Sequence, residues 1–120
     1  LTNGRAAYGG GVYCWGSDPI IRNCIFTWND AQSGGGGMYS AYSQPTLSNC
    51  IFELNSVLNE EGPGGALLAT YSDVALDHCT FYGNTATRGA GIHVLVHGMA
   101  QEASASRARR IRAIDEPRGT

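Results

Sequence analysis

The chain contains no lysine, and all eight of its basic residues are arginine. Residues 1–97 hold three arginines and seven acidic residues, whereas residues 98–120 hold five arginines and three acidic residues. The first part is therefore mildly acidic and offers no basic stripe that could follow a nucleic-acid backbone. The later arginines stand beside Asp115 and Glu116 and make a weak case for a nucleic-acid arm. Nucleic acid is not an expected partner.

Long apolar runs are also missing, since no stretch approaches the ~18 residues of a transmembrane helix. No stretch keeps the apolar period of a helix. There is no Cys-x-x-Cys pair and no histidine at ligand spacing, so we expect neither a zinc site nor a cofactor. The sequence has no initiating methionine and no signal peptide, an absence that carries no information if the chain is a fragment.

Glycine, in contrast, is abundant, with 17 residues among 120 against a usual share of about 7%. The glycines are grouped and do not form a low-complexity tract. Groups stand directly before an apolar residue, as at Gly9–Gly11 before Val12 and at Gly34–Gly37 before Met38. With 42% hydrophobic residues, the composition fits one folded domain.

A seven-residue motif occurs three times, at residues 23–29 (NCIFTWN), 49–55 (NCIFELN) and, loosened, 78–84 (HCTFYGN). The three copies share the pattern Cys-x-Phe-x-x-Asn. A repeat of fixed length indicates identical supersecondary units that stack as the coils of a solenoid.

The apolar residues that follow the glycines set the register of this repeat: Val12, Met38, Leu67 and Ile92. In each complete unit the cysteine stands 12 residues after this anchor, the phenylalanine two residues further and the asparagine three beyond that. All variation in length falls between the asparagine and the next anchor, where a surface loop can vary without disturbing the stack. One coil is therefore about 25 to 29 residues long.

Short alternating stretches predict three strands in each coil, because period two is typical of a strand. In the first coil they contain Val12 and Cys14, Pro19 and Ile21, and Cys24 and Phe26. The step of three between Ile21 and Cys24 indicates a corner, and a turn at residues 16–18 and a glycine-rich loop provide the other separations. We predict an all-β fold, a right-handed parallel β-helix of about three full coils plus partial coils, with its hand set by the crossover rule.

Each repeated position then has a physical role in the stack. We expect an inward aliphatic ladder, an inward aromatic ladder and an asparagine ladder, the last with left-handed backbone at the asparagines and amides that bond to the next coil. In that order, the three ladders are Ile21, Leu47 and Leu76; Phe26, Phe52 and Phe81; and Asn29, Asn55 and Asn84. The glycines before each anchor allow positive φ or close approach of adjacent coils.

The segments Gly-Gly-Gly-Val, Gly-Gly-Gly-Met and Gly-Gly-Ala-Leu, paired with Phe-x-x-Asn, resemble the repeats of the right-handed β-helix superfamily, and in particular those of polymorphic outer-membrane proteins. The resemblance covers residues 1 to about 97. That superfamily includes adhesin-like surface proteins and polysaccharide-processing enzymes, so the fold it implies does not choose a function. We find no match to its pectate-lyase or polygalacturonase branches, since Val96-His97-Gly98 is only a fragment of a Gly-His-Gly segment.

The repeat places residues 1–97 in a β-helix that begins inside a coil, because Asn3 occupies the ladder position of a preceding one. The register predicts Cys, Phe and Asn at 104, 106 and 109, but Ser104, Ser106 and Arg109 stand there. We therefore expect residues 98–120 to form an arginine-rich tail, either disordered or frame-shifted, or a weak helical cap over residues 101–113.

The four cysteines are expected in the core. Cys24, Cys50 and Cys79 share one inward column, and Cys14 belongs to a separate column with Ser40, Ala69 and Val94. Buried stacked thiols behave as small hydrophobic groups. A bridge between neighbouring coils is a second possibility, because a spacing of ~4.8 Å between strands lies within the Cα range of a disulfide.

Two surface columns could carry chemistry. Asp18 and Asp73 share a turn column with Gln44 and are weak catalytic candidates, because aspartate at a turn is normally a cap of its local backbone. His78 is more typical of a turn residue than of a catalytic base.

Outward positions along the first strand carry Tyr13, Tyr39, Leu68 and His93, with Trp15 near Tyr13. Tyr13, Trp15, Tyr39 and His93 are candidates for stacking on sugar rings. The alternative is that these residues cover strand edges or pack under the glycine-rich loops.

We favour a non-catalytic repeat segment of a secreted or surface-exposed protein of bacterial type, with a structural, adhesive or passenger role. Its partners would be the neighbouring β-helix coils of a longer chain and a polysaccharide or cell-surface glycan. The alternatives are a fragment of a carbohydrate-active β-helix enzyme, of the polysaccharide-lyase or glycoside-hydrolase kind, and a carbohydrate-binding module.

Overall fold

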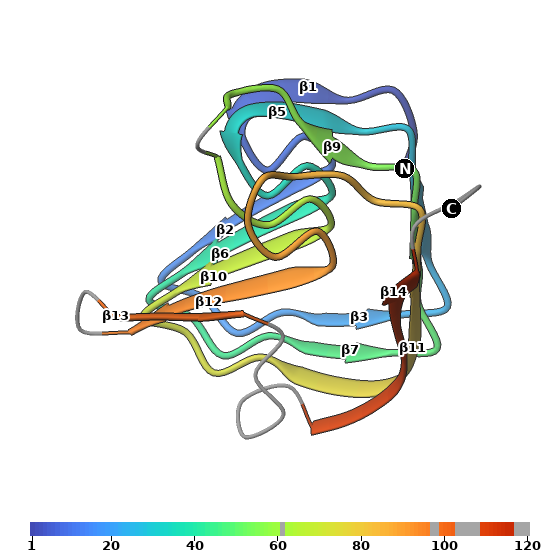
Figure 1. Ribbon diagram of the computed structural model, residues 1–120. Coiled ribbons are helices and arrows are strands. Elements are labelled where there is room, and N and C mark those ends of the chain that lie inside the picture. Colours follow the sequence, from blue (N-terminus) through green and yellow to red (C-terminus); the bar gives the residue numbers. More distant parts are fainter. Residues whose placement is uncertain (61, 97–98, 103–108, 117–120) are drawn as a thin grey trace.

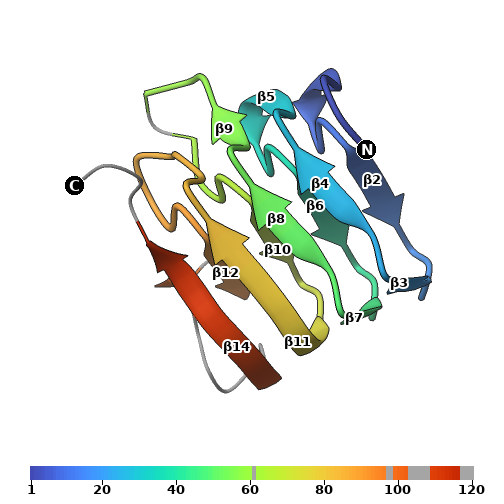
Figure 2. The same cartoon turned by 90° about the vertical axis from the view of Figure 1, so that its right-hand side faces the viewer.

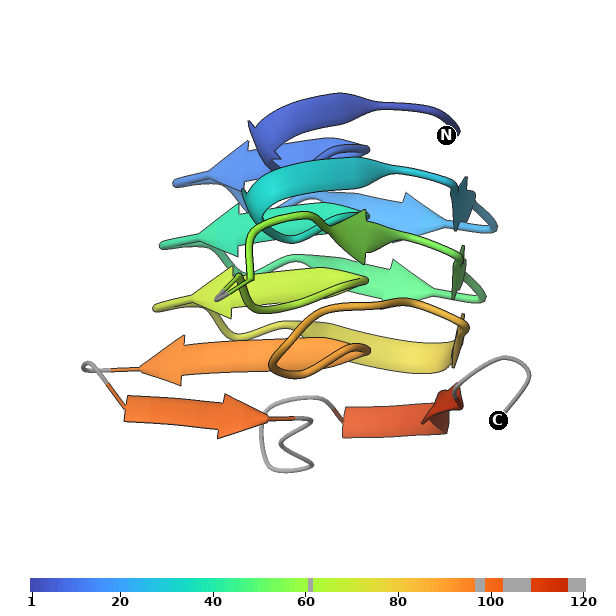
Figure 3. The same cartoon turned by 45° about the horizontal axis from the view of Figure 1, so that its top comes forward.

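The computed structural model of the chain describes residues 1–60, 62–96, 99–102 and 109–116, with side chains described as far as residue 93. Parallel strands stack as the coils of a β-solenoid, and the described part contains no helix (Figure 1). Successive coils follow one another along the solenoid axis, which Figure 3 makes plain. The predicted all-β parallel architecture is confirmed.

Three sheets form the walls of the solenoid. The first consists of β1 (Arg5–Tyr8), β5 (Asp30–Gly34) and β9 (Ser56–Val57). The second runs in the order β2 (Val12–Trp15), β6 (Met38–Ala41), β10 (Leu67–Thr70), β12 (Ile92–Val96) and β13 (Met99–Glu102). The third contains β3 (Ile20–Arg22), β4 (Ile25–Thr27), β7 (Thr46–Ser48), β8 (Ile51–Glu53) and the longer β11 (Ala75–Tyr82), and β14 (Arg109–Glu116) lies beside β11 (Figure 2).

The first two coils contribute four strands each, where alternation predicted three, and in the third coil the single strand β11 pairs with both β7 and β8. The additional strand, β5, occupies residues that the sequence assigned to the glycine-rich loop. Its burial points to Ala31 as its inward hydrophobic side chain, so no apolar alternation marks it. Backbone pairing defines it instead, since Asp30 N donates to Gly4 O and Ser56 N donates to Asn29 O, each at 2.9 Å. The strand β5 is therefore held by backbone hydrogen bonds to the adjacent coils and not by large apolar side chains of its own.

The predicted core ladders are confirmed. The rings of Phe26 and Phe52 stack with centroids 4.3 Å apart and planes 3° from parallel, and those of Phe52 and Phe81 stack at 5.0 Å and 4°. Ile21 and Leu76 flank Leu47 in strand register. Burial of each large apolar side chain contributes about 1.5–3 kcal/mol, so these columns supply much of the hydrophobic stabilisation of the coil.

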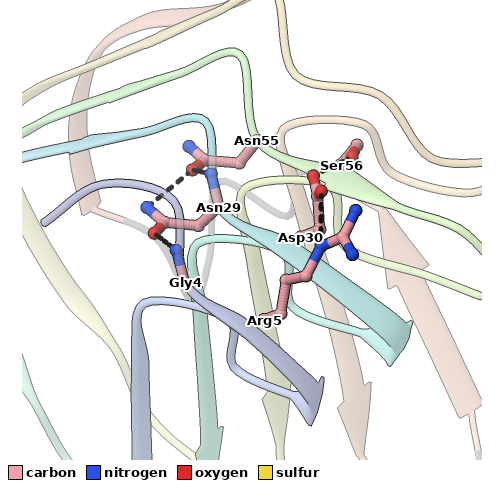
Figure 4. A network of polar contacts seen from close by, with 6 residues as sticks. All are labelled: Gly4, Arg5, Asn29, Asp30, Asn55 and Ser56. Atoms are coloured by element: carbon pink, nitrogen blue, oxygen red, sulfur yellow. Dashed lines mark hydrogen bonds and ion pairs between the residues drawn. The ribbon is translucent and has the colours of Figure 1, made fainter.

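The asparagine ladder is also confirmed (Figure 4). Asn29 Nδ2 donates to Asn55 Oδ1 at 3.0 Å, and Asn55 Nδ2 donates to Asn84 Oδ1 at 2.9 Å. The same two oxygens accept the backbone N–H groups of Asn29 and Asn55 at 3.0 and 2.9 Å. Every amide in this buried corner thus joins one coil to the next.

Left-handed backbone at the ladder asparagines was a wrong prediction. The positive φ angles fall one residue earlier, at Trp28 (56°), Leu54 (58°) and Gly83 (68°). The turn is therefore made by the residue before each asparagine, and Asn29 donates both its backbone N–H and its side-chain amide to Asn55.

The glycines before each anchor serve both predicted purposes. Gly35 has φ of 66°, a conformation that residues with a Cβ rarely adopt. At Gly36 a Cβ would lie 2.4 Å from the carbonyl oxygen of Gly65 in the next coil. The backbones of adjacent coils are therefore too close for any larger residue at this point.

The C-terminal segment differs from the disordered or helical tail that was expected. Residues 99–102 form β13, which turns back antiparallel to β12, and residues 109–116 form β14, which continues the third sheet. In that sheet Ile111 pairs with Cys79, so the chain rejoins the stack seven residues later than the repeat register required. Residues 97–98, 103–108 and 117–120 of the expected tail lie outside the described residues.

We predict that Asn55→Leu destabilises the protein by about 3–5 kcal/mol. The substitution removes the acceptor of the Asn29 N–H and the donor to Phe26 O, and a buried polar group without a partner costs about 1–3 kcal/mol. Urea unfolding followed by circular dichroism measures the change. Gln44→Leu, which replaces an exposed amide in the same way, should change stability by less than about 0.5 kcal/mol. Equal losses in the two variants would contradict the role of the ladder.

Candidate functional site

The acidic column proposed as a weak catalytic site lies on the turns that precede β3, β7 and β11. Asp18, Gln44 and Asp73 are all exposed there. A carboxylate oxygen of Asp18 accepts the backbone N–H of Gln44 at 2.9 Å, so Asp18 caps the neighbouring coil and not its own turn. This contact gives Asp18 a structural role, and catalysis by Asp18 and Asp73 stays a prediction.

Three tyrosines gather where the end of β1 meets the second sheet, with Tyr8 in β1, Tyr13 in β2 and Tyr39 in β6. The ring of Tyr39 lies between those of Tyr8 and Tyr13, with centroid distances of 4.8 and 5.2 Å. We call these three residues the Tyr39 cluster. Burial raises the pKa of the Tyr39 phenol above its ordinary value of 10.0, while a hydrogen bond with Thr70 opposes the rise. The phenol therefore stays protonated at neutral pH and able to donate a hydrogen bond.

His93 does not belong to this surface. It follows Leu68 and Tyr39 in register as predicted, but it is only 1% exposed and cannot stack on a ligand. The glycine-rich loops explain the difference, because a Cβ on Gly89 would lie 2.9 Å from His93 Cβ and one on Gly34 would lie 2.5 Å from Leu68 Cδ2. Packing under these loops, the alternative reading of the column, is therefore correct for His93 and Leu68.

A second aromatic group consists of Trp15, Tyr42 and Tyr71, and only Trp15 among them was a candidate from the sequence. The rings of Trp15 and Tyr42 have centroids 5.1 Å apart, and those of Tyr42 and Tyr71 stack at 5.3 Å with an angle of 11°. All three are exposed, and we call them the Trp15 row. Tyr42 and Tyr71 stand four residues after the anchors Met38 and Leu67, and this common offset was the signal that could have found them.

The backbone beneath the Trp15 row has an unfavourable conformation for tyrosine. Tyr42 and Tyr71 have φ of 51° and 49°, at the position that Gly16 occupies in the first coil with φ of 62°. The left-handed region costs a residue with a Cβ roughly 1–2 kcal/mol. Together the Tyr39 cluster and the Trp15 row form an aromatic face along the second sheet and its borders, since Tyr8 ends β1 and Tyr42 and Tyr71 directly follow β6 and β10.

His78 lies at the corner inside β11 with φ of 56°, as expected of a turn residue. Its Nδ1 is 2.7 Å from Asp77 Oδ1. Beside it is a cavity of about 270 Å³, lined by Asn49, Cys50, Ile51, His78 and Thr80. The cavity is smaller than the ~300 Å³ at which ligand pockets usually begin.

The cysteines occupy the predicted columns. Cys14, Cys50 and Cys79 are buried, Cys24 is half-buried, and all four are free thiols. Burial raises the pKa of Cys50 and of Cys79 above the ordinary value of 9.0. The protonated, unreactive form of both thiols is therefore favoured in the folded state.

A family profile described as the right handed beta helix region matches residues 2–106 of the chain. The chain belongs to this family. The matched span contains every strand from β1 to β13, so the stacked coils and the aromatic face lie on a right-handed β-helix. Comparison with curated proteins finds no match, and neither does comparison with solved structures.

Two further observations concern only the described part of the β-helix. Within it, no group of three or more His, Cys, Asp or Glu side chains is placed to hold a metal ion. The same residues include no helix with the length and hydropathy of a membrane span.

The buried thiols lead to a prediction about alkaline pH. Because the folded-state pKa values of Cys50 and Cys79 are raised, the stability associated with their protonated form is complete below the unfolded pKa. It is lost as the pH rises through the folded pKa. We expect a Cys50→Ala/Cys79→Ala variant to lose less stability than the wild type as the pH rises above the ordinary thiol pKa of 9.0, measured by urea unfolding.

Cys24→Ala is the matched control, since it removes a half-buried thiol from the same column, and it should keep a larger alkaline loss of stability than the double variant. Titration of denatured, non-reduced protein should find four free thiols. Parallel pH profiles for all three proteins would show that the buried thiols do not couple to folding.

Proposed function

We propose that this right-handed β-helix is a non-catalytic adhesive or scaffold segment of a secreted or surface-exposed protein, and that it binds polysaccharide or cell-surface glycan. The aromatic face on the second sheet is the observation that carries this proposal. Its members are Tyr8, Tyr13, Tyr39, Trp15, Tyr42 and Tyr71.

The chemistry of the face suits a sugar polymer. An aromatic surface packs against the C–H groups of a pyranose ring, while phenol hydroxyls exchange hydrogen bonds with sugar hydroxyls. Tyr42 and Tyr71 stack on each other and are both exposed, whereas Trp15 is tilted by 57° from Tyr42 at the end of the row. Stacking contacts are thus offered at Trp15, and polar contacts along the row.

The left-handed backbone beneath the row is not itself a mark of a binding site, because Trp28 and Leu54 have the same conformation at another corner of the solenoid. It provides a test, since glycine is more stable than tyrosine in this conformation.

The repeated geometry favours a linear ligand. The aromatic groups recur from coil to coil at ring spacings of 4.8 to 5.3 Å. A polymer lying along the solenoid axis can therefore meet similar contacts on successive coils, and solenoids present extended surfaces of this kind. The resemblance of the units to polymorphic outer-membrane protein repeats supports a location at the cell surface.

Tyr42→Gly provides a test that separates binding from folding. Loss of ring stacking costs about 0.5–1.5 kcal/mol per pair, and relief of the left-handed strain returns roughly 1–2 kcal/mol. We expect a stability within about 1 kcal/mol of the wild type and an affinity about tenfold lower for the polysaccharide that binds best. Affinity electrophoresis in gels containing neutral or acidic polysaccharides measures that affinity.

Trp28→Gly is the matched control, because Trp28 is also an exposed aromatic residue with positive φ but lies at the corner between β4 and β5. It should bind like the wild type, and its remaining tryptophan, Trp15, should report binding by a change in fluorescence. Turnover of any polysaccharide would reject the non-catalytic role in favour of a carbohydrate-active enzyme. Unchanged binding by Tyr42→Gly would reject the aromatic face as the site.

A further inference from the structure

A second surface feature lies on the first sheet, next to Tyr8 at the edge of the aromatic face, and none of the residues that line it belongs to that face. The outer side of β1, β5 and the end of β9 carries a cavity of about 330 Å³. Its lining consists of Arg5, Ala6, Ala7, Asp30, Gln32 and Leu58. Ligand pockets usually measure about 300–1,000 Å³, so this cavity has the size for one small ligand.

The polar side of the cavity consists of the ion pair between Arg5 and Asp30, and the hydroxyl of Ser56 is hydrogen-bonded to Asp30 (Figure 4). Arg5 Nε is 3.7 Å from Asp30 Oδ2, and Ser56 Oγ donates to Asp30 Oδ1 at 2.6 Å. The Arg5 side chain is 80% exposed and that of Asp30 is 27% exposed. A guanidinium has five N–H donors and a carboxylate about four acceptor positions, so both groups keep capacity for a ligand.

The asparagine ladder fixes the position of this pair. Asp30 directly follows Asn29, whose N–H and side-chain amide both bond to Asn55 Oδ1. On the opposite side, the Gly4 N–H donates to Asn29 Oδ1 at 2.9 Å, and Arg5 follows Gly4. Asp30 and Arg5 therefore project from backbone that the buried ladder holds, and sites on such rigid elements bind with little loss of entropy.

The charges of the cavity select the ligand. A carboxylate or phosphate would be repelled by Asp30, and a cation would be repelled by Arg5. A neutral compound with two adjacent hydroxyls satisfies both groups, because each hydroxyl can donate to the carboxylate and accept from the guanidinium. Gln32 offers a donor and an acceptor, and Leu58 and Ala7 offer apolar surface to the C–H groups of a sugar ring.

We propose that this cavity binds the vicinal diol of a neutral pyranose, and that Asp30 and Arg5 form the hydrogen bonds to its two hydroxyls. The assignment to a sugar rests on the proposed function, whereas the site itself is separate from the aromatic face. Among the residues that line the cavity, Asp30 is the one carboxylate. Glycoside hydrolysis generally uses a pair of carboxyl groups, so the site is one for binding.

The test measures saturation transfer by NMR from the protein to the methyl glycosides of glucose, galactose, mannose and fucose. At least one should bind the wild type, and its per-O-methylated derivative, which has no hydroxyl donors, should not. A hydrogen bond to a charged group contributes about 1.5–3 kcal/mol. Asp30→Asn and Arg5→Gln should therefore raise the Kd by about tenfold or more.

Asp18→Asn is the control, since it removes an exposed carboxylate outside the cavity, and it should bind like the wild type. Ala7→Met, which fills the cavity without changing its hydrogen-bonding groups, should also abolish binding. Circular dichroism melting checks that each variant is folded. No saturation transfer to any of the four glycosides, or wild-type binding by Asp30→Asn, would overturn the proposal.

Two further comparisons separate this site from the proposed function. Tyr42→Gly should keep glycoside binding even where it loses polysaccharide binding. Polysaccharide binding that depends on Tyr42 but not on Asp30, with no glycoside bound, would reject the cavity and leave the aromatic face in place. Glycoside binding that depends on Asp30, without polysaccharide binding, would reject the proposed function and leave the cavity.

Discussion

Asn29, Asn55 and Asn84 meet at one buried corner, and the hydrogen bonds between them are the constraint on which the other features depend. A shift of one residue in any coil would leave buried amide groups without partners, at a cost of about 1–3 kcal/mol for each group. This penalty fixes the register of all strands on either side of the corner. The phenylalanine stack lies three residues before each asparagine, and the Arg5–Asp30 pair lies directly after the ladder.

Fixed register turns the outer surface into columns, and each column has its own chemistry. On the second sheet the columns bring tyrosines and a tryptophan together, and on the first sheet they bring Arg5, Asp30 and Ser56 together. Loop length modifies this pattern. The glycine-rich loops of the later coils cover Leu68 and His93, so the aromatic face is confined to the part of the sheet that these loops leave open.

The repeat predicted the features that depend on spacing alone. The spacing of Cys50, Phe52 and Asn55 from Met38 is repeated in the other coils, and the structure places the corresponding columns as the sequence indicated. The strand β5 could not be predicted, because Ala31 gives no hydrophobic period and backbone pairing with neighbouring coils defines the strand. As a result the cavity beside Asp30 was also missed, since that segment was assigned to a loop. Burial of His93 depends on loops distant in the sequence, which no local pattern encodes.

The direction of the asparagine hydrogen bonds has a consequence for how such a protein can change in length. Asn29 Nδ2 and Asn55 Nδ2 donate to the asparagine oxygen of the coil that follows and also to a backbone carbonyl of the coil that precedes, whereas each ladder oxygen accepts from the coil that precedes. The stack is therefore polar, with head-to-tail contacts throughout. A tandem duplication or deletion of one whole coil leaves every donor opposite an acceptor, whereas an inverted segment would set donor against donor. Duplication or loss of one coil can therefore lengthen or shorten this β-helix while the core contacts between coils stay the same.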